Sequence, residues 1–412
     1  MKCRHCHAEL ALSLMDLGSA PHSNAYLTEQ GLHAPELWFP LRVLVCRACW
    51  LVQTEDVVAA DALFNEDYAY FSSYSETWLR HAEAYVASMV GRLGLDSNSL
   101  VVELAANDGY LLQYVQVRGI PCLGIEPTAG TARVARQKGL EIIEAFFGTG
   151  LGTELAASGR QADLVTANNV LAHVPDINDF LSGIARLLKP EGTATFEFPH
   201  LLNLVTETQF DTIYHEHFSY LSMTALDGIL GRNQLRAFDL ETLSTHGGSL
   251  RVFVQRADAP PKIPSPSLVG CLEAEAVAGI RSDAFYGSFQ SRADDIKNRF
   301  LEFLLQAKRD GKTVVGYGAA AKGNTLLNHA GVGPDLLSHV IDRNPAKQGK
   351  YLPGSRIPIR EEALLKQLRP DFVLILPWNL REEVVEQLAY IREWGGRFVT
   401  VVPVLRISEA RA

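Results

Sequence analysis

The sequence lacks three features that would place the protein at a membrane, in a secretory pathway or on a nucleic acid. No apolar run approaches the ~18 residues that span a bilayer. The formal net charge is −9, so there is no excess of positive charge to displace counterions from a phosphate backbone. The first residues, Met1–Cys6, contain no apolar stretch of the kind that directs export. We therefore expect a cytoplasmic protein that binds neither membranes nor nucleic acids.

The remaining composition is that of an ordinary globular protein. Hydrophobic residues make up 47% of the sequence and charged residues 21%. A length of 412 residues suggests two or three domains. The boundaries that we expect are 1–66, 67–257 and 258–412, and the third part opens with a proline-rich linker at 258–266.

Cysteine is scarce, but four of the six cysteines form two Cys-x-x-Cys pairs: Cys3, Cys6, Cys46 and Cys49. Four thiolates provide the tetrahedral sulfur shell that zinc prefers. A redox disulfide is the alternative, which a reducing compartment disfavours. Because four sulfur ligands leave no coordination position for a substrate, we expect a structural zinc ion.

Residues 100–198 alternate apolar runs with helical stretches, which predicts an α/β domain with a doubly wound parallel sheet. A buried strand from Leu100 leads into a turn at Gly109, and further strands are expected at 121–126, 141–147, 162–168 and 193–198. A carboxylate at the end of the second strand can accept ribose hydroxyl groups. The turn has one glycine instead of the three of a dinucleotide motif, which weakens the case for a dinucleotide.

The densest group of reactive side chains is Tyr214, His215, Glu216 and His217. Histidine titrates near neutral pH and suits proton abstraction from a weak carbon acid. A polar loop whose histidines satisfy backbone groups is the alternative. His-Glu-His lacks the two intervening residues that place both imidazoles of a zinc protease on one helical face. The cluster therefore indicates acid–base chemistry.

A second polar aromatic segment, Asp67–Tyr74, contains three tyrosines and two serines. It predicts either a lid that presents phenol groups to a ligand or a packing segment at a domain edge. A helix is expected to follow, over residues 75–93.

The carboxyl-terminal part has its own alternating pattern, with a helical region at 267–310 and then strands at 313–318, 337–342, 371–377 and 397–402. A helix is expected over 381–394. Gly316-x-Gly318-x-x-Ala321, with Asp342 further on, is similar to a dinucleotide fingerprint and raises the alternative of a nicotinamide dehydrogenase. A packing domain without a ligand is a further alternative.

The chain resembles class I S-adenosylmethionine-dependent methyltransferases, because its first two strands end at Glu103 and Glu126 and Leu188–Gly192 precede the fifth. Further motifs are the two cysteine pairs, Glu103-x-x-x-Asn-Asp-Gly109, Tyr214–Phe218 and His246–Arg251. Together they resemble the sugar C-methyltransferases of deoxysugar pathways over nearly the whole chain. That family acts on nucleotide-activated 4-keto-6-deoxyhexoses.

The resemblance assigns roles to individual residues. It implies cofactor contacts from Glu103, Asn107, Gly109, Glu126, Asn168 and one of Phe146 or Phe147. It implies a reaction centre of His173, Tyr214, Glu216 and His217, with His217 as the base and Tyr68 or Tyr70 from the lid. Asn168 and His173 have an alternative role as the cap and first turn of a helix. His215 is assigned to the substrate, with a smaller role than His217.

In the family, the carboxyl-terminal domain faces the first α/β domain across the substrate. A helix start and a lysine can hold a diphosphate there. The candidate nucleotide contacts are Tyr317, Lys322, Asp342, Arg343, Asn344 and Lys347.

The resulting expectation is an enzyme that methylates carbon 3 of a nucleotide-linked 4-keto-6-deoxyhexose through an enolate, with no catalytic metal. Thymidine diphosphate is the first choice for the nucleotide, guanosine and cytidine diphosphates are alternatives, and the protein is expected to be a monomer. Two other classes stay open: a methyltransferase for another small-molecule acceptor, and a non-catalytic protein that binds sugar nucleotides.

Overall fold

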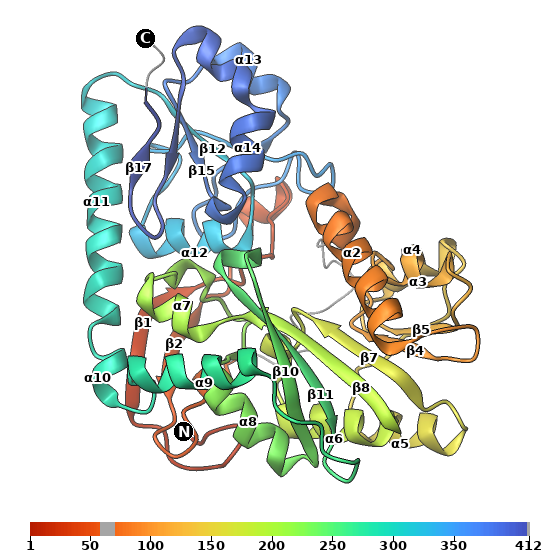
Figure 1. The fold of residues 1–412 in the computed structure, drawn as a ribbon. Helices are drawn as coiled ribbons and strands as arrows, with labels where there is room; N and C mark the ends of the chain where they lie inside the picture. Colours follow the sequence, from red (N-terminus) through yellow and green to blue (C-terminus); the bar gives the residue numbers. More distant parts are fainter. Residues whose placement is uncertain (58–70, 410–412) are drawn as a thin grey trace.

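The computed structural model describes residues 1–57 and 71–409 and contains three sheets (Figure 1). The first sheet has four strands in the order β1-β2-β3-β9 and is antiparallel. Its strands are β1 (Leu12–Ala20), β2 (Phe39–Val45), β3 (Val52–Thr54) and β9 (Ser219–Tyr220). The short 3-10 helix η1 (Gln30–His33) lies between β1 and β2. Because β9 directly follows the Tyr-His-Glu-His run, the cysteine-bearing module is joined to that run by backbone hydrogen bonds.

The second sheet has seven strands in the order β10-β11-β8-β7-β4-β5-β6. Their bounds are β4 (Val101–Leu104), β5 (Cys122–Ile125), β6 (Ile142–Ile143), β7 (Ala162–Asn168), β8 (Leu188–Pro199), β10 (Leu235–Leu243) and β11 (Ser249–Arg256). β11 runs opposite to the other six strands, because it pairs antiparallel with both of its neighbours, β8 and β10. The strand order reverses at β4, and doubly wound sheets bind their ligands at the carboxyl end of such a reversal.

Helices cover both faces of this second sheet (Figure 1). Side chains alternate along each strand, so Val101 and Leu164 face one core cluster while Val102 and Val165 face the other. The first cluster includes residues of α2 (Glu76–Leu93), α3 (Leu112–Gln116) and α4 (Ala129–Gln137). The second includes residues of α5 (Thr149–Ala157), α6 (Ile177–Leu187) and α8 (Met223–Arg232).

The third sheet has six strands in the order β14-β13-β12-β15-β16-β17, with β17 antiparallel. Its strands are β12 (Val314–Tyr317), β13 (Val340–Ile341), β14 (Ile359–Arg360), β15 (Phe372–Ile375), β16 (Arg397–Thr400) and β17 (Arg406–Ile407). The helices of this part are α9 (Pro266–Ala278), α10 (Asp283–Tyr286), α11 (Phe289–Arg309), α12 (Ala321–Ala330), α13 (Ala363–Leu368) and α14 (Arg381–Gln387).

Short helices complete the described chain. They are α7 (Leu201–Thr206), η2 (Ser72–Tyr74), η3 (Leu171–His173), η4 (Phe210–Thr212), η5 (Thr245–Gly247), η6 (Trp378–Leu380) and η7 (Ala389–Trp394). The long helix α11 runs along one side of the molecule from the third sheet to the cysteine-bearing module (Figure 1). No helix in the described ranges combines the length and the hydropathy needed to cross a membrane.

The predicted elements differ from the structure mainly in their length and continuity. The strand expected over 141–147 is limited to Ile142–Ile143, and that expected over 337–342 to Val340–Ile341. The helix expected over 381–394 is broken into α14 and η7, and the helical region 267–310 contains three helices. The β10–β11 hairpin was not predicted, whereas the helix expected over 75–93 matches α2.

Candidate active site and zinc site

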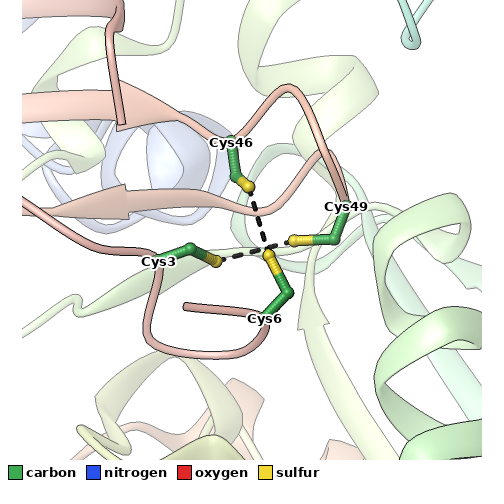
Figure 2. A group of neighbouring side chains, drawn as sticks. All are labelled: Cys3, Cys6, Cys46 and Cys49. Carbon is green, nitrogen blue, oxygen red and sulfur yellow. Dashed lines mark hydrogen bonds between the residues drawn. The ribbon is translucent and has the colours of Figure 1, made fainter. Parts of the chain in front are cut away.

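The four cysteines of the two Cys-x-x-Cys pairs come together at one point (Figure 2). Their sulfur atoms lie within 4.8 Å of one another, and the Cys3–Cys49 and Cys6–Cys46 sulfur pairs are 3.6 and 3.5 Å apart. Four sulfurs about 2.3 Å from zinc form a tetrahedron with edges of roughly 3.8 Å, so the arrangement fits that ion. All four are free thiols, and no disulfide joins them.

The two cysteine pairs lie in loops of the same construction. The amides of His7 and Trp50 donate to the carbonyls of Cys3 and Cys46, at 3.0 and 2.7 Å. His7 and Trp50 have φ values of 63° and 61°, so each loop closes through a left-handed residue. This repeated geometry brings two sulfurs from each loop to one centre.

The turn after β4 is fixed by the carboxylate of Glu126 at the end of β5. Its two oxygens accept hydrogen bonds from the backbone amides of Asn107 at 2.8 Å and Thr128 at 2.9 Å. Gly109 has a φ of 77°, and an added Cβ would lie 2.3 Å from Leu140 Cδ1. Glycine is therefore required there by both conformation and space.

A cavity of about 720 Å³ opens beside this turn and is lined by residues of both α/β domains. Of the predicted cofactor contacts, five line it: Asn107, Glu126, Phe146, Phe147 and Asn168. Glu103 and Gly109 do not. Glu103 is 1% exposed, and burial raises the pKa of its carboxyl group well above the usual range. We infer that Glu103 and Gly109 shape the turn from behind the cavity wall.

The predicted reaction centre occupies another wall of the same cavity. His173, Tyr214, Glu216 and His217 all line it. The ring of His217 lies 4.0 Å from that of Tyr214 and 4.7 Å from that of His173, centroid to centroid. The structure therefore brings together all the described members of the predicted centre, whereas Tyr68 and Tyr70 lie outside the described residues.

His217 has a defined hydrogen-bonding state. Its Nδ1 lies 2.8 Å from the carbonyl oxygen of Thr212, and a carbonyl can only accept a hydrogen bond. Nδ1 therefore carries the proton, and Nε2 keeps its lone pair. Burial, and then the neighbouring His173, hold the pKa of His217 well below its usual value. The imidazole is neutral at physiological pH and can accept a proton.

The carboxylate of Glu216 has a hydrogen-bond partner in the cysteine-bearing module. It accepts two hydrogen bonds from Nδ2 of Asn24, at 2.7 and 2.9 Å. Burial raises the pKa of Glu216 to about 7, and the hydrogen bonds from Asn24 and the charge of Lys347 oppose that increase. The amide of His217 donates to the carbonyl of Tyr214, which closes a backbone turn. Because the backbone turns here, the side chains of Glu216 and His217 both reach the cavity.

His215 does not line the cavity, contrary to its assignment as a substrate contact. Its Nε2 lies 3.1 Å from the carbonyl oxygen of Pro40, to which it can donate. The ring packs against His22 and Phe39 of the cysteine-bearing module. The backbone turn directs this side chain into the module interface, where it has a structural role.

Two of the six predicted nucleotide contacts line the cavity, namely Lys322 and Lys347. Nζ of Lys322 donates to Oδ1 of Asn379 at 2.8 Å and lies over the ring of Trp378. Nζ of Lys347 donates to the carbonyl oxygen of Ala319 at 2.7 Å. Burial lowers the pKa of Lys322, and the charge of Asp211 opposes this decrease.

The other four, Tyr317, Asp342, Arg343 and Asn344, do not line the cavity. Asp342 accepts from the amides of Ala319 and Asn344, at 2.7 and 2.8 Å, so its carboxylate holds the loop that precedes α12. Tyr317 and Arg343 both contact Gln387. The glycines of the fingerprint have a packing role, because a Cβ on Gly318 would lie 2.5 Å from Pro377. These contacts explain the dinucleotide-like pattern without a dinucleotide.

Sequence reasoning did not assign three of the residues that line the cavity: Asn24, Trp78 and His246. His246 has φ 54° and ψ 24°, and its ring meets the Trp78 ring edge-on at 5.4 Å. Its Nδ1 is buried and has no hydrogen-bond partner among the described residues. The His246-Gly-Gly motif was visible in the sequence, but nothing in it indicated which wall of which domain it joins.

A second cluster of metal-ligand residue types, His200, Cys271 and Glu275, has a structural explanation. The carboxylate of Glu275 accepts from the amides of Met223 and Thr224, both at 2.7 Å, at the start of α8. It also lies 2.6 Å from Nε2 of His200. The positive end of a helix stabilises this carboxylate and disfavours a cation.

Comparisons with known proteins agree with this organisation. Three family models match in succession: a zinc-binding domain over residues 3–64, a methyltransferase domain over 78–240 and a C-methyltransferase C-terminal domain over 244–403. The chain is 36% identical to the C-methyltransferase NovU of Streptomyces niveus over 411 residues, which cover 100% of this chain and 97% of NovU. It is also 27% identical over 112 residues to a ubiquinone biosynthesis O-methyltransferase of Azorhizobium caulinodans, covering 25% of this chain and 44% of that protein.

Solved structures match part of the chain at low identity. One is magnesium protoporphyrin IX methyltransferase of Synechocystis PCC 6803, with 19% identity, a TM-score of 0.35, and coverage of 43% of this chain and 83% of that one. Another is the PH0226 protein of Pyrococcus horikoshii OT3, with 16% identity and a TM-score of 0.38. The match covers 46% of this chain and 95% of that one. The assignment of the fold rests on the strand order and the family models.

The doubly wound sheet with its single antiparallel strand, the cavity at the strand reversal and the matching methyltransferase family model define a class I S-adenosylmethionine-dependent methyltransferase. The chain belongs to the C-methyltransferase family. S-adenosylmethionine is its methyl donor and zinc its structural ion, which confirms the predicted cofactors. Nothing in these matches favours the alternative of a nicotinamide dehydrogenase.

Proposed function

We propose that this C-methyltransferase acts on carbon 3 of a nucleotide-linked 4-keto-6-deoxyhexose. The observation that carries the proposal is the neutral His217, which has a fixed proton on Nδ1 and a lone pair on Nε2, in a cavity shared by both α/β domains. Carbon methylation needs a carbanion equivalent, and a base beside a ketone can generate one. The NovU relationship over the whole chain supports the transfer of methyl to carbon.

In the proposed reaction, the ketone at carbon 4 acidifies the proton on carbon 3. Nε2 of His217 accepts that proton, and the electrons of the carbon–hydrogen bond pass to the carbon 4 oxygen as an enolate. S-adenosylmethionine supplies an electrophilic methyl group, which carbon 3 gains as S-adenosylhomocysteine is released. The proton on His217 then leaves to solvent.

The remaining cavity residues bind and orient the two reactants. Glu126, Asn107 and Asn168 present polar atoms beside the β4 turn for the cofactor, and Phe146 and Phe147 present aromatic faces. Lys322 and Lys347 supply the positive charge that a diphosphate needs. Enclosure by two domains brings the reactants together, which lowers the entropic part of the barrier.

Product analysis tests this proposal. The purified protein is incubated with methyl-labelled S-adenosylmethionine and a panel of thymidine-, guanosine- and cytidine-diphosphate 4-keto-6-deoxyhexoses. The expected result is a product one methyl group heavier, with the label on carbon 3 by nuclear magnetic resonance. A label on oxygen, or no transfer to any member of the panel, would reject the proposed substrate class.

A further inference from the structure

The cysteine-bearing module contributes a side chain to the catalytic cavity. Asn24 lies in the segment between β1 and β2, and both Asn24 and Glu216 line the cavity. Nδ2 of Asn24 donates to both carboxylate oxygens of Glu216, at 2.7 and 2.9 Å. An amide nitrogen can only donate and an ionised carboxylate can only accept. The contact therefore stabilises the ionised form of Glu216.

The segment around Asn24 is fixed to the carboxyl-terminal domain on both sides of that residue. The carbonyl of Ser23 accepts from Nδ2 of Asn324 at 2.5 Å. The hydroxyl of Tyr26 donates to the carbonyl of Ala319 at 2.6 Å. Further along, the amide of Leu27 donates to the carbonyl of Tyr351 at 2.9 Å, and the amide of Tyr351 donates to the carbonyl of Leu27 at 2.8 Å. Asn24 is therefore presented to Glu216 from a segment with a defined position.

The same segment is connected to the zinc site by the β1–β2 hairpin. Leu12 pairs with Val45 at one end of the hairpin, directly before Cys46, and Ala20 pairs with Phe39 at the other end. A strand of this length extends roughly 30 Å. The zinc site therefore holds the end of the hairpin opposite to the end that leads to Asn24.

We propose that Asn24 is a positioning residue for Glu216, which directs the carboxyl group into the cavity and favours its ionised form. On this view the zinc-binding module completes the active site in addition to folding around its metal. The inference deepens the proposed function and rests on it for the part that Glu216 plays in turnover.

The charges around Glu216 set the sign of the effect. Lys347 and the phenol of Tyr26 face it from the carboxyl-terminal domain and the module, and His173 contacts its backbone. Burial raises the pKa of Glu216 to about 7, whereas Asn24 and Lys347 lower it. Removing the amide of Asn24 should therefore raise this pKa further. Any activity that needs the carboxylate would then be lost at a higher pH as the solution is acidified.

Two variants of Asn24 and one matched control test the inference. Asn24→Ala removes the donor, and Asn24→Leu removes it at nearly constant size, so the second variant decides if the first fails to fold. Asn98→Ala is the control, because Asn98 is an exposed asparagine whose side chain contacts Asp96 and lies outside the segment around Asn24. The primary measurement is the titration of the Glu216 carboxyl carbon by nuclear magnetic resonance, in the zinc-loaded full chain, with the signal assigned from Glu216→Gln.

The expected result is an increase of about one unit in the apparent pKa of Glu216 in both Asn24 variants and no change in Asn98→Ala. The acid limb of the profile of kcat against pH should move to higher pH by the same amount. The zinc content and the affinity for S-adenosylmethionine should stay unchanged. An unshifted titration in the Asn24 variants, or an equal shift in the control, would overturn the inference. The titration needs no sugar acceptor, so it still decides the role of Asn24 if the keto-sugar panel fails.

Discussion

The reactive state of His217 depends on contacts that are specific to single atoms. The carbonyl of Thr212 fixes the proton on Nδ1, so the basic nitrogen is Nε2. Burial makes the imidazolium costly, which keeps the ring neutral before substrate binds. His215, two residues earlier, donates to a backbone carbonyl in the module interface. The two histidines of one motif therefore provide a test residue and a matched control.

Replacing His217 with Asn should lower kcat by about 10²–10⁴-fold, which is the usual contribution of a general base. The affinity for S-adenosylmethionine, measured by calorimetry, should stay unchanged. With S-adenosylhomocysteine bound, the wild-type enzyme should exchange the carbon 3 proton of the keto-sugar with deuterated water, and His217→Asn should not.

The control for this experiment is His215→Asn, which should exchange the proton at close to the wild-type rate. Rapid exchange in His217→Asn, with exchange lost instead in His173→Asn or Tyr214→Phe, would move the base to one of those residues. The class of reaction would be unaffected by that outcome.

His246 provides a second test at the residue scale. Its buried Nδ1 has no partner among the described residues, and burial and then Lys322 lower its pKa to about 4. A neutral imidazole in the cavity can donate to the oxygen on which enolate charge develops. His246→Asn retains the left-handed backbone, which Asn tolerates, and removes the ring. We expect kcat to fall by about 10²-fold with unchanged cofactor affinity, and a kcat equal to that of the wild type would exclude this role.

At the scale of elements, the sequence predicted the buried parallel strands and their functional ends best. Strands that are covered on both faces are continuous apolar runs in the sequence. Glu126 directly follows the run of β5, and Asn168 is the last residue of β7. The break between α14 and η7 could not be predicted, because no glycine or proline marks it. The partnership of Asn24 and Glu216 joins residues from different modules and leaves no local signal in the sequence.

The fingerprint at the start of α12 illustrates a motif whose residues have another role. Gly318 permits close packing on Pro377, and Asp342 occupies the amide of Ala319 that an anion would otherwise bind. Lys322, the second residue of the helix, lines the cavity together with Ala320 and Ala321. Sequence spacing was therefore sufficient to find the lysine, whereas the packing of Gly318 and the contact of Asp342 with Ala319 could be seen only in the structure.

Lys322→Ala should raise the KM for the sugar nucleotide by about 10–100-fold, since a charge-assisted contact to phosphate contributes roughly 1.5–3 kcal/mol. The affinity for S-adenosylmethionine should not change. Lys308→Ala is the matched control, because Lys308 lies on the exposed face of α11 and forms a surface ion pair with Asp335. Weakened cofactor binding with an unchanged KM for the sugar would contradict the role given to this domain.

At the scale of the whole molecule, the zinc-binding module and the carboxyl-terminal domain share one hydrophobic core. A single cluster contains Val43 of β2, Phe300 of α11 and Leu374 of β15. The β9 strand extends the module's sheet from the middle of the chain. The module is therefore packed against the other domains, and loss of its metal should affect more than its own fold.

Removal of zinc should consequently destabilise the entire protein. Cys46→Ser deletes one of four ligands, and metal binding to such sites is coupled to folding. Freshly purified, reduced wild-type protein should contain one zinc ion per chain, and the variant should contain less and melt at a lower temperature. In domains of 150–250 residues each kcal/mol lost lowers Tm by roughly 2–4 °C. Cys271→Ser is the control, because Cys271 lies outside the zinc site, and it should retain both the zinc and the Tm of the wild type.

Since the shared core links the module to the third sheet, we expect one broad loss of structure when the Cys46→Ser variant is heated. A separate early transition confined to the module, with activity retained above it, would show that the module folds independently of the catalytic domains.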